Sequence, residues 1–180
     1  MFREEIKIPK DRVAVLIGKK GLEKRKLERK AKAKIKVSRE GDVIIEGKDS
    51  LLLFDLKLVI KAIGRGFNPE IAENLFREDY ALEIVEIKEF SGKSKKKLIR
   101  LRGRMIGKKG KARQTIEKLT NTSIVIYGKT VSIIGKIEDV MKAKEAVEYL
   151  LSGAPHGHVY GWIERKKRKE KMEKYREEFY

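Results

Sequence analysis

The pentapeptide Ile-Gly-Lys-Lys-Gly occurs twice in this chain of 180 residues, at 17–21 and again at 106–110. The residues that follow each copy also correspond, first at an offset of 89 and then, after one residue is lost in a turn, at 88. The corresponding pairs are Leu27/Ile116, Glu28/Glu117, Ile35/Ile124, Val37/Ile126, Val43/Val131, Ile45/Ile133, Gly47/Gly135 and Lys48/Lys136. A chain with this internal repeat is expected to fold as two copies of one small module.

Each copy predicts the same order of elements: strand, helix, glycine loop, helix, strand, strand, helix. For the first copy we expect strand 4–8, a short helix ending at Ile17, helix 22–32, strands 34–37 and 43–46, and a helix from the N-cap Asp49 to Gly64. For the second copy we expect strand 81–87, helices 96–106 and 111–120, strands 123–127 and 131–134, and a helix over about 138–151. A short helix should begin at Asn68-Pro69, and a charged helix or disordered tail at Trp162.

The charge balance points to a polyanionic partner. Lys and Arg total 45 against 27 Asp and Glu, a formal net charge of +18, and 40% of the residues are charged. Nucleic acid is the commonest intracellular polyanion. The surface of a thermophilic protein would also be rich in Lys and Glu, but its positive and negative charges should be about equal in number. Residues 91–153 carry 16 basic and 5 acidic side chains, so the second copy is the more basic one.

Several functional classes are excluded or disfavoured. The chain has no cysteine, which excludes disulfides and thiolate metal sites. His156 and His158 are separated only by a glycine, which favours a turn over a metal site. No acid–base pair or activated nucleophile is evident, so we expect neither an enzyme nor a cofactor. No apolar stretch reaches the roughly 20 residues of a membrane span, and the N-terminus lacks a signal-peptide core, so we expect a cytoplasmic protein.

The repeated loop suits contact with a phosphodiester backbone. Two glycines let the chain approach phosphates closely, and the helix that follows presents unpaired N–H groups and a positive dipole end. The loop residues, with basic neighbours in the second copy, are Gly18, Lys19, Lys20, Gly21, Arg104, Gly107, Lys108, Lys109, Gly110, Lys111 and Arg113. Beside the loops, the similarity of this pattern to the KH module, an RNA-binding fold, implies a narrow apolar groove for about four unpaired bases. Its predicted floor includes Ile17, Ile35, Val37, Ile106, Ile124 and Ile126.

This pattern resembles the KH module, an RNA-binding fold with a Gly-x-x-Gly loop between two helices. Competing folds fit less well. The stretch 103–109 lacks the spacing and the Ser or Thr of a nucleotide-binding P-loop, and RRM or OB folds need base-stacking aromatics on their strands. We therefore expect an α+β chain of two tandem type I KH domains, each βααββα with a three-stranded sheet packed on helices, plus a charged C-terminal helical tail. The expected boundaries are 1–67, a helical linker 68–80, 81–153, and the tail 154–180.

The tandem arrangement further resembles the two-KH small-subunit ribosome assembly factors of the partner-of-Nob family, in its archaeal form. The stretches that carry the resemblance are Arg65-Gly-Phe-Asn-Pro-Glu, Arg104-Met-Ile-Gly-Lys-Lys-Gly-Lys and Thr115-Ile-Glu-Lys-Leu-Thr-Asn-Thr-Ser-Ile. The resemblance implies binding of single-stranded RNA near the 3′ end of small-subunit rRNA, mainly through the second module. It also implies docking of a Nob-type endonuclease or translation initiation factor two. We expect the protein to be a monomer. Eukaryotic relatives typically lack the first glycine loop, which is intact here.

Two alternatives stay open at the level of sequence. One is a general KH regulator of messenger or small RNA, and the other is a scaffold whose KH folds bind proteins.

Overall fold

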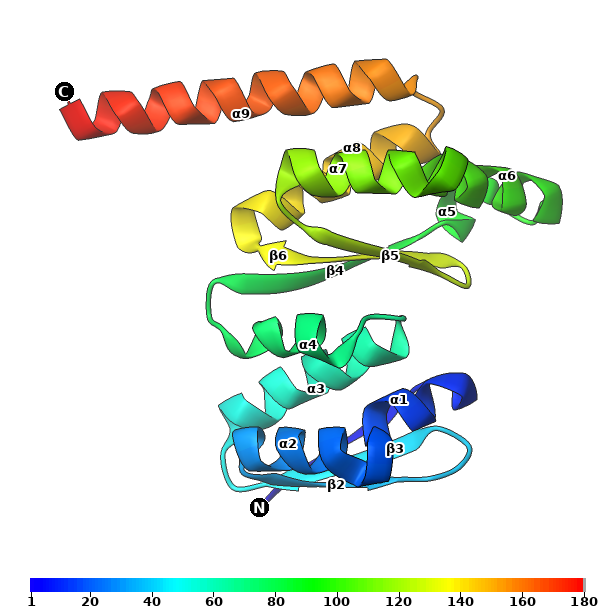
Figure 1. Cartoon of the computed structure of the whole chain (residues 1–180), viewed down its shortest axis with the longest axis vertical. Helices are drawn as coiled ribbons and strands as arrows, with labels where there is room; N and C mark the ends of the chain where they lie inside the picture. The colour runs from blue at the N-terminus through cyan, green and yellow to red at the C-terminus, as the bar shows by residue number, and fades with distance from the viewer. Residues whose placement is uncertain (180) are drawn as a thin grey trace. The chain divides into compact units, whose positions relative to one another are not determined.

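The computed structural model describes residues 1–179, and the chain divides into two compact units, Met1–Leu82 and Glu83–Tyr180. Each unit contains one three-stranded sheet whose last strand in sequence is the central one. Helices cover each sheet, as Figure 1 shows for α7 and α8 in the second unit. The predicted α+β architecture of two KH folds and a C-terminal helix is therefore confirmed.

The first unit follows the predicted order closely. Its strands and helices are β1 (Phe2–Lys7), α1 (Val13–Ile17), α2 (Leu22–Ala31), β2 (Ala33–Val37), β3 (Asp42–Gly47), α3 (Ser50–Gly64) and α4 (Pro69–Ala72). Short 3-10 segments cover Lys10–Arg12, Lys19–Gly21 and Glu73–Phe76. In the sheet, β3 pairs antiparallel with β1 and with β2. The Asp49 side chain accepts hydrogen bonds from the N–H groups of Leu51 and Leu52, which fixes the start of α3 as the sequence predicted.

The second unit repeats this order and adds a helix. Its elements are β4 (Tyr80–Glu86), α5 (Lys88–Ser91), α6 (Lys95–Ile106), a 3-10 turn (Lys108–Gly110), α7 (Lys111–Thr120), β5 (Ser123–Tyr127), β6 (Thr130–Lys136), α8 (Ile137–Leu151) and α9 (His156–Phe179). The sheet order is β4-β6-β5, with β5 and β6 antiparallel. Predicted and observed bounds agree to within about two residues up to Leu151.

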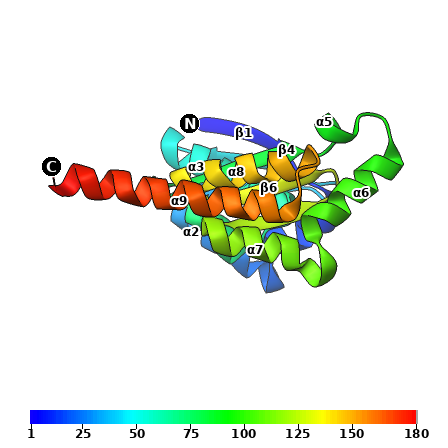
Figure 2. The ribbon, with the colours of Figure 1, turned by 90° about the horizontal axis from the view of Figure 1, so that it is seen from above.

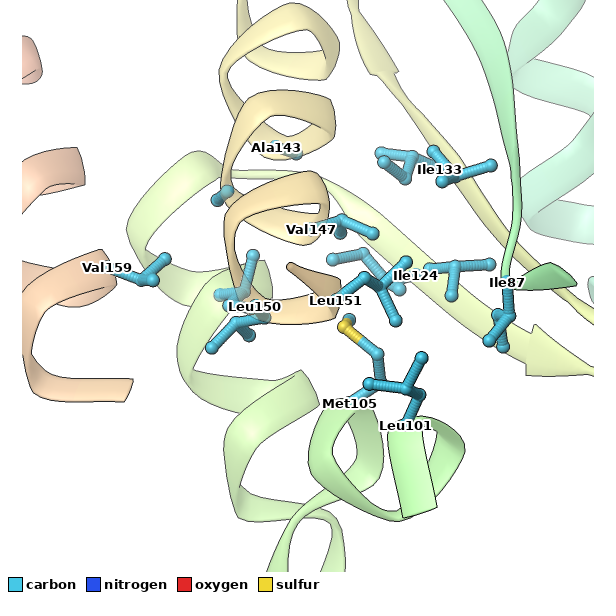
Figure 3. Close-up of a cluster of buried hydrophobic side chains, with 14 of the residues drawn as sticks. Ile87, Leu101, Met105, Ile124, Ile133, Ala143, Val147, Leu150, Leu151 and Val159 are labelled. Carbon is cyan, nitrogen blue, oxygen red and sulfur yellow. The ribbon is translucent and has the colours of Figure 1, made fainter. Parts of the chain in front are cut away.

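The core of the second unit is a continuous aliphatic cluster between the sheet and its helices. Figure 3 shows Met105 of α6, Ile124 and Ile133 of the sheet, and Leu150 of α8 meeting there. All four are almost completely removed from solvent. Burial of this kind contributes about 25 cal/mol for each Å² of apolar surface and supplies the main stabilisation of the unit.

The long helix α9 belongs to this core at its N-terminal end. It begins at His156, six residues before the predicted start, and Val159 and Ile163 are 2% and 0% exposed. In Figure 2 α9 runs alongside α7 and α8, against both of which it packs. Trp162 lies edge-on to Tyr149 of α8, with 5.1 Å between ring centroids. The segment after Gly153 is thus structured.

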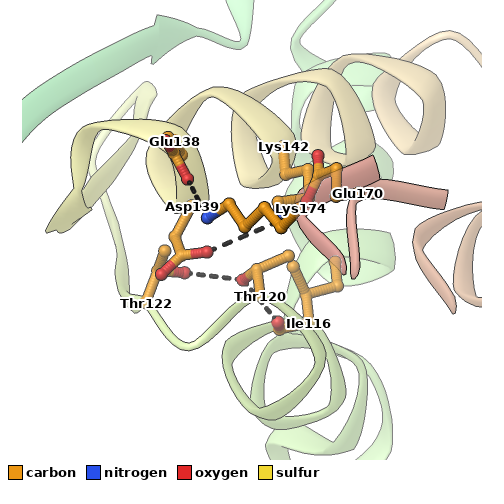
Figure 4. A network of polar contacts seen from close by, with 8 residues as sticks. All are labelled: Ile116, Thr120, Thr122, Glu138, Asp139, Lys142, Glu170 and Lys174. Carbon is orange, nitrogen blue, oxygen red and sulfur yellow. Dashed lines mark hydrogen bonds and ion pairs between the residues drawn. The ribbon is translucent and has the colours of Figure 1, made fainter. Parts of the chain in front are cut away.

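Beyond Ile163, α9 is tied to α8 by ion pairs. Lys166 contacts Glu145 at 2.8 Å and Lys174 contacts Glu138 at 3.2 Å. Between them, the almost fully buried Lys142 of α8 bonds to Glu170 and lies 3.5 Å from Asp139, as Figure 4 shows. The outer part of α9 is held by charge, and the inner part by apolar contact.

Truncating Ile163 should destabilise the second unit. We expect Ile163→Ala to lower the free energy of unfolding by about 2–4 kcal/mol, because it leaves a cavity among buried side chains. Urea denaturation followed by circular dichroism measures this. Met172→Ala, at a position 56% exposed on the same helix, is the control and should change the stability by less than about 0.5 kcal/mol. Equal small changes for both variants would mean that α9 is not part of the core.

Candidate nucleic-acid interface

The two glycine loops have nearly the same backbone conformation. The first glycine has φ 72°, ψ 176° at Gly18 and φ 73°, ψ 173° at Gly107. The closing glycine has φ 74°, ψ 17° at Gly21 and φ 75°, ψ 9° at Gly110. The second lysine of each loop is also left-handed, with φ 52° at Lys20 and at Lys109. A non-glycine residue held at positive φ costs about 1–2 kcal/mol, and such strain tends to occur at functional sites.

The two glycines of the second loop serve different purposes. A Cβ added at Gly107 would lie only 2.6 Å from the backbone nitrogen of Ala112, so the first glycine permits close packing against α7. A Cβ at Gly110 would meet nothing nearer than 3.7 Å, so the second leaves the backbone open to a ligand. The loop therefore combines a tight internal contact with an accessible outer surface.

The lysines of the loops are available for an anion. Within residues 1–179, the ammonium groups of Lys19, Lys20, Lys108 and Lys109 have no hydrogen bond or ion pair. Lys108 and Lys109, which are exposed, also line a surface pocket of about 480 Å³ together with Lys111, Gln114, Thr115 and Lys118. This pocket adjoins the N-terminus of α7, which favours negative charge. The site is arranged to take a phosphate group.

The residue that packs on the first glycine differs between the modules. In the second module it is Ala112, and in the first it is Glu23. A Cβ at Gly18 would lie 2.7 Å from Cγ of Glu23, so this side chain lies directly against the loop. Its Oε2 is buried and lacks a hydrogen-bond partner among the described residues. The first loop therefore has a carboxylate where the second has a methyl group.

The predicted groove residues divide into surface and core. Ile17, Val37 and Ile126 are half-buried, and Ile106 is 37% exposed, so these four offer apolar surface. Ile35 and Ile124 are buried to within 1%. Side chains two residues apart share one face of a strand, so Ile35 lies on the same face as Val37, and Ile124 on the same face as Ile126. Only Val37 and Ile126, nearer the strand ends, keep some exposure. Ile35 and Ile124 therefore do not form an exposed floor of the predicted groove.

The outer edges of β2 and β5 are occupied by side chains from the preceding helix. The N–H of Ile35 donates to Oε1 of Glu28 at 2.8 Å, and the N–H of Ile124 donates to Oε1 of Glu117 at 2.7 Å. In the second module, Arg113 also donates to the carbonyl of Ile124 at 3.3 Å and lies 3.7 Å from Glu117. Arg113 therefore lines the strand edge and is partly neutralised there.

Arg104 is used inside the fold. Its guanidinium donates to the carbonyls of Leu150 at 3.3 Å and Ala154 at 2.6 Å, and its own carbonyl lies 3.0 Å from Nε2 of His156. Arg12 makes the same kind of contact in the first unit, donating to the carbonyls of Ile63 and Phe67 at 2.8 Å. These arginines satisfy carbonyls at and beyond the helix end, which lack partners within the helix. The prediction that Arg104 faces phosphate is not supported by this geometry.

Comparison with known proteins places these features in a family. Residues 81–168 match the model of a eukaryotic-type KH domain (KH-domain type I), the second such domain of PNO1, and residues 3–51 match the KH domain model. A KH domain-containing protein of Methanocaldococcus jannaschii is 46% identical over 176 residues, covering 96% of this chain and 77% of that protein. A crystal structure of the a/eIF2alpha–aDim2p–rRNA complex of Pyrococcus horikoshii holds a chain that is 44% identical, with a TM-score of 0.86. The match covers 93% of this chain and 95% of that one.

The chain belongs to the PNO1 family of two-KH-domain proteins. The resemblance to the partner-of-Nob family is thereby confirmed. The pre-rRNA-processing protein PNO1 of Candida albicans is 38% identical over 103 residues, which are 57% of this chain but 37% of that protein. The present chain thus spans less than half the length of this fungal PNO1 protein. The PNO1 model extends to residue 168, in agreement with the packing of α9 into the second unit.

Sequence reasoning alone missed three parts of this PNO1-family site. It aligned Glu28 with Glu117 but gave them no role, and it passed over Glu23 opposite Ala112. A difference in charge at matched positions of the repeat was the signal that could have identified Glu23.

Within residues 1–179, no group of three or more His, Asp or Glu side chains is placed to hold a metal ion. No helix in that range is long and apolar enough to cross a membrane.

Replacing Arg104 should affect stability more than RNA binding. We expect Arg104→Ala to lower the free energy of unfolding by about 2–3 kcal/mol, because two hydrogen bonds from a charged donor are removed. Chemical denaturation measures this change, and fluorescence anisotropy with a single-stranded RNA measures affinity under conditions where the variant is folded. Arg104→Lys is the control, since it keeps the charge but not the planar donor. If Arg104→Ala lost RNA affinity that Arg104→Lys retained, phosphate contact would be its role after all.

Proposed function

We propose that this protein is a non-enzymatic RNA-binding factor of small-subunit ribosome assembly. It binds single-stranded RNA near the 3′ end of the small-subunit rRNA through its glycine loops, mainly that of the second module. The observation that carries the proposal is the Gly107–Gly110 loop before α7, with its open backbone and with Lys108 and Lys109, which have no ion pair among residues 1–179. The solved Pyrococcus relative, which was crystallised with rRNA, has the same fold over almost its whole length.

The second module is the main RNA-binding unit in this proposal because its basic groups are less neutralised. In the first module, Lys26 and Lys30 both pair with Glu73, at 2.6 and 3.3 Å, and Lys36 pairs with Glu46 at 3.0 Å. Contact with the Glu73 carboxylate raises the pKa of Lys26, because the carboxylate favours the charged ammonium. By contrast, Lys93, Lys95, Lys96, Lys97 and Arg100 before the second loop have no ion pair within residues 1–179.

The proposed RNA-binding residues form two sets. At the loops they are Gly18, Lys19, Lys20, Gly21, Gly107, Lys108, Lys109, Gly110 and Lys111. Beside the loops they are Ile17, Val37, Ile106, Arg113 and Ile126, with Ile35 and Ile124 supporting the groove from the core. A groove of this kind takes unpaired bases against apolar side chains while the loop binds the backbone.

The domain division and the partners belong to the same proposal. In this division the first KH domain is 1–67, a helical linker is 68–80, the second KH domain is 81–153 and a basic tail is 154–180. The first turns of the tail pack with the second domain. The solved complex contains a/eIF2alpha with aDim2p, which supports an initiation-factor partner for this chain. A Nob-type endonuclease is the second proposed partner. We place the protein in the cytoplasm as a monomer without a cofactor.

The double variant Lys108→Asp/Lys109→Asp should lose most RNA binding. Both charges beside the phosphate site change sign, so affinity for a 3′-terminal small-subunit rRNA fragment should fall by at least about tenfold. Anisotropy titrations at two salt concentrations measure this loss and its salt dependence. Lys19→Asp/Lys20→Asp is the matched variant in the first loop and should cost less. An equal or larger loss there would overturn the ranking of the modules, and unchanged affinity in both would exclude the proposed RNA site.

Removing the Glu23 carboxylate should strengthen the first loop. In the Lys108→Asp/Lys109→Asp background, we expect Glu23→Ala to raise RNA affinity about threefold, because a negative charge next to the phosphate site is removed. The reciprocal change Ala112→Glu, made in the wild-type protein, should weaken binding by a similar factor. Both variants are checked for folding by circular dichroism. If neither changes RNA affinity, this position does not distinguish the two modules.

A further inference from the structure

A second basic pocket lies at the start of α6, separate from the glycine loop. It has a volume of about 470 Å³ and brings together residues from α5, the loop after it, the first turn of α6 and the turn between β5 and β6. Its lining consists of Lys88, Ser91, Gly92, Lys93, Ser94, Lys95, Leu98, Ile99 and Lys129. The N–H of Ile87 donates to the carbonyl of Lys129 at 2.9 Å, which joins the two turns at this end of the sheet (Figure 1).

The charge in this pocket is uncompensated. Four of its lining residues are lysines, and none of the described lining residues is acidic. Lys88, Lys93, Lys95 and Lys129 have no ion pair within residues 1–179. The four positive charges around this cavity repel one another, and an anion bound between them would offset that repulsion.

The pocket also has an apolar wall. Leu98 is half-buried and Ile99 is 69% exposed, one of the larger exposures of an aliphatic side chain in the chain. Gly92, at φ 59°, has nothing within 4 Å of the position of an added Cβ, so the rim is open there. Lysines beside an exposed aliphatic surface suit a nucleotide, whose phosphate is anionic and whose base has an apolar face.

Helix α6 connects this pocket to the second glycine loop. It starts at Lys95 and ends at Ile106, and twelve residues at 1.5 Å each span about 18 Å. Ile99, Gly103 and Ile106 follow one another at helical spacing and are all exposed, with open space at Gly103. This face forms an apolar strip from the pocket to the loop. Stacked nucleotides rise about 3.4 Å each, so about five would cover the distance.

We propose that this pocket, the α6 entry pocket, binds a further nucleotide of the same RNA strand that the second glycine loop grips. The proposal rests on the proposed RNA-binding function and extends the binding site from about four nucleotides to about nine or ten. The four lysines contact phosphates and Ile99 contacts a base. The ligand class is a single-stranded polyribonucleotide.

The test compares two RNA lengths in the full chain. The probes are nested single-stranded RNAs of four and ten nucleotides from the 3′ end of archaeal small-subunit rRNA, titrated by anisotropy or by competition. Wild-type protein should bind the longer RNA more tightly. Lys93→Glu/Lys129→Glu should lose that gain while weakening the four-nucleotide RNA only slightly, through the overall field of the protein. The salt dependence for the longer RNA should also fall, by about 0.7 in the slope of log affinity against log salt for each phosphate that a lysine no longer neutralises.

The control reverses two positive charges elsewhere in the second unit. Lys167→Glu/Lys171→Glu changes two exposed α9 lysines that have no ion pair within residues 1–179. It should weaken both RNAs slightly and equally, through the overall field of the protein. If the pocket variant behaves like this control, or if wild-type protein gains nothing from the longer RNA, the α6 entry pocket is not a nucleotide site. Failure of the proposed function would give a different result: Lys108→Asp/Lys109→Asp would then leave the affinity for the four-nucleotide RNA unchanged.

Discussion

The contact between the first glycine of each loop and the first turn of the following helix is the constraint on which each module depends. At Gly107 this contact is so close that any Cβ would collide with the backbone of Ala112. It allows α6 and α7 to meet at a sharp corner while both keep their apolar faces on the sheet. The same corner leaves Gly110 open and directs the lysines outward. Packing and ligand access therefore come from one backbone geometry.

Two loops with identical sequence and nearly identical dihedral angles differ in what surrounds them. Glu23 brings a carboxylate to the first loop, and Glu73 binds two lysines of the adjacent helix. In the second module Ala112 is neutral, and the helix before the loop, Lys95–Ile106, carries basic residues and no acid, whereas Val13–Ile17 before the first loop is uncharged. Phosphate affinity depends on the summed field at the site. Duplication has preserved the shape of the loop while its electrostatic environment has diverged.

The sequence predicted the fold well because the signals were local. Alternation identified β2 and β5, and Asp49 and Gly64 marked the ends of α3. The site was predicted less well. Alternation places Ile35 with Val37 and Ile124 with Ile126 on one face of each strand, but it does not say which of these side chains the helices cover completely. Arg104 was assigned by its nearness to the loop, whereas its carbonyl partners at Leu150 and Ala154 lie some 50 residues away. In α9 only Val159 and Ile163 are buried, too few to predict packing.

The two kinds of contact along α9 imply that this helix does not open as one unit. Its first turns are fixed by apolar burial, which salt does not weaken, and the almost fully buried Lys142 holds Glu170 in the middle. Lys174 holds the last turns through an exposed ion pair to Glu138 that ions screen. Rising ionic strength should therefore release the outer turns first and leave the inner turns in place. Hydrogen exchange would then show a graded boundary within a single continuous helix. The turns after Glu170 carry Lys171, Lys174 and Arg176, so their release would free a short flexible arm while the second KH domain stays folded.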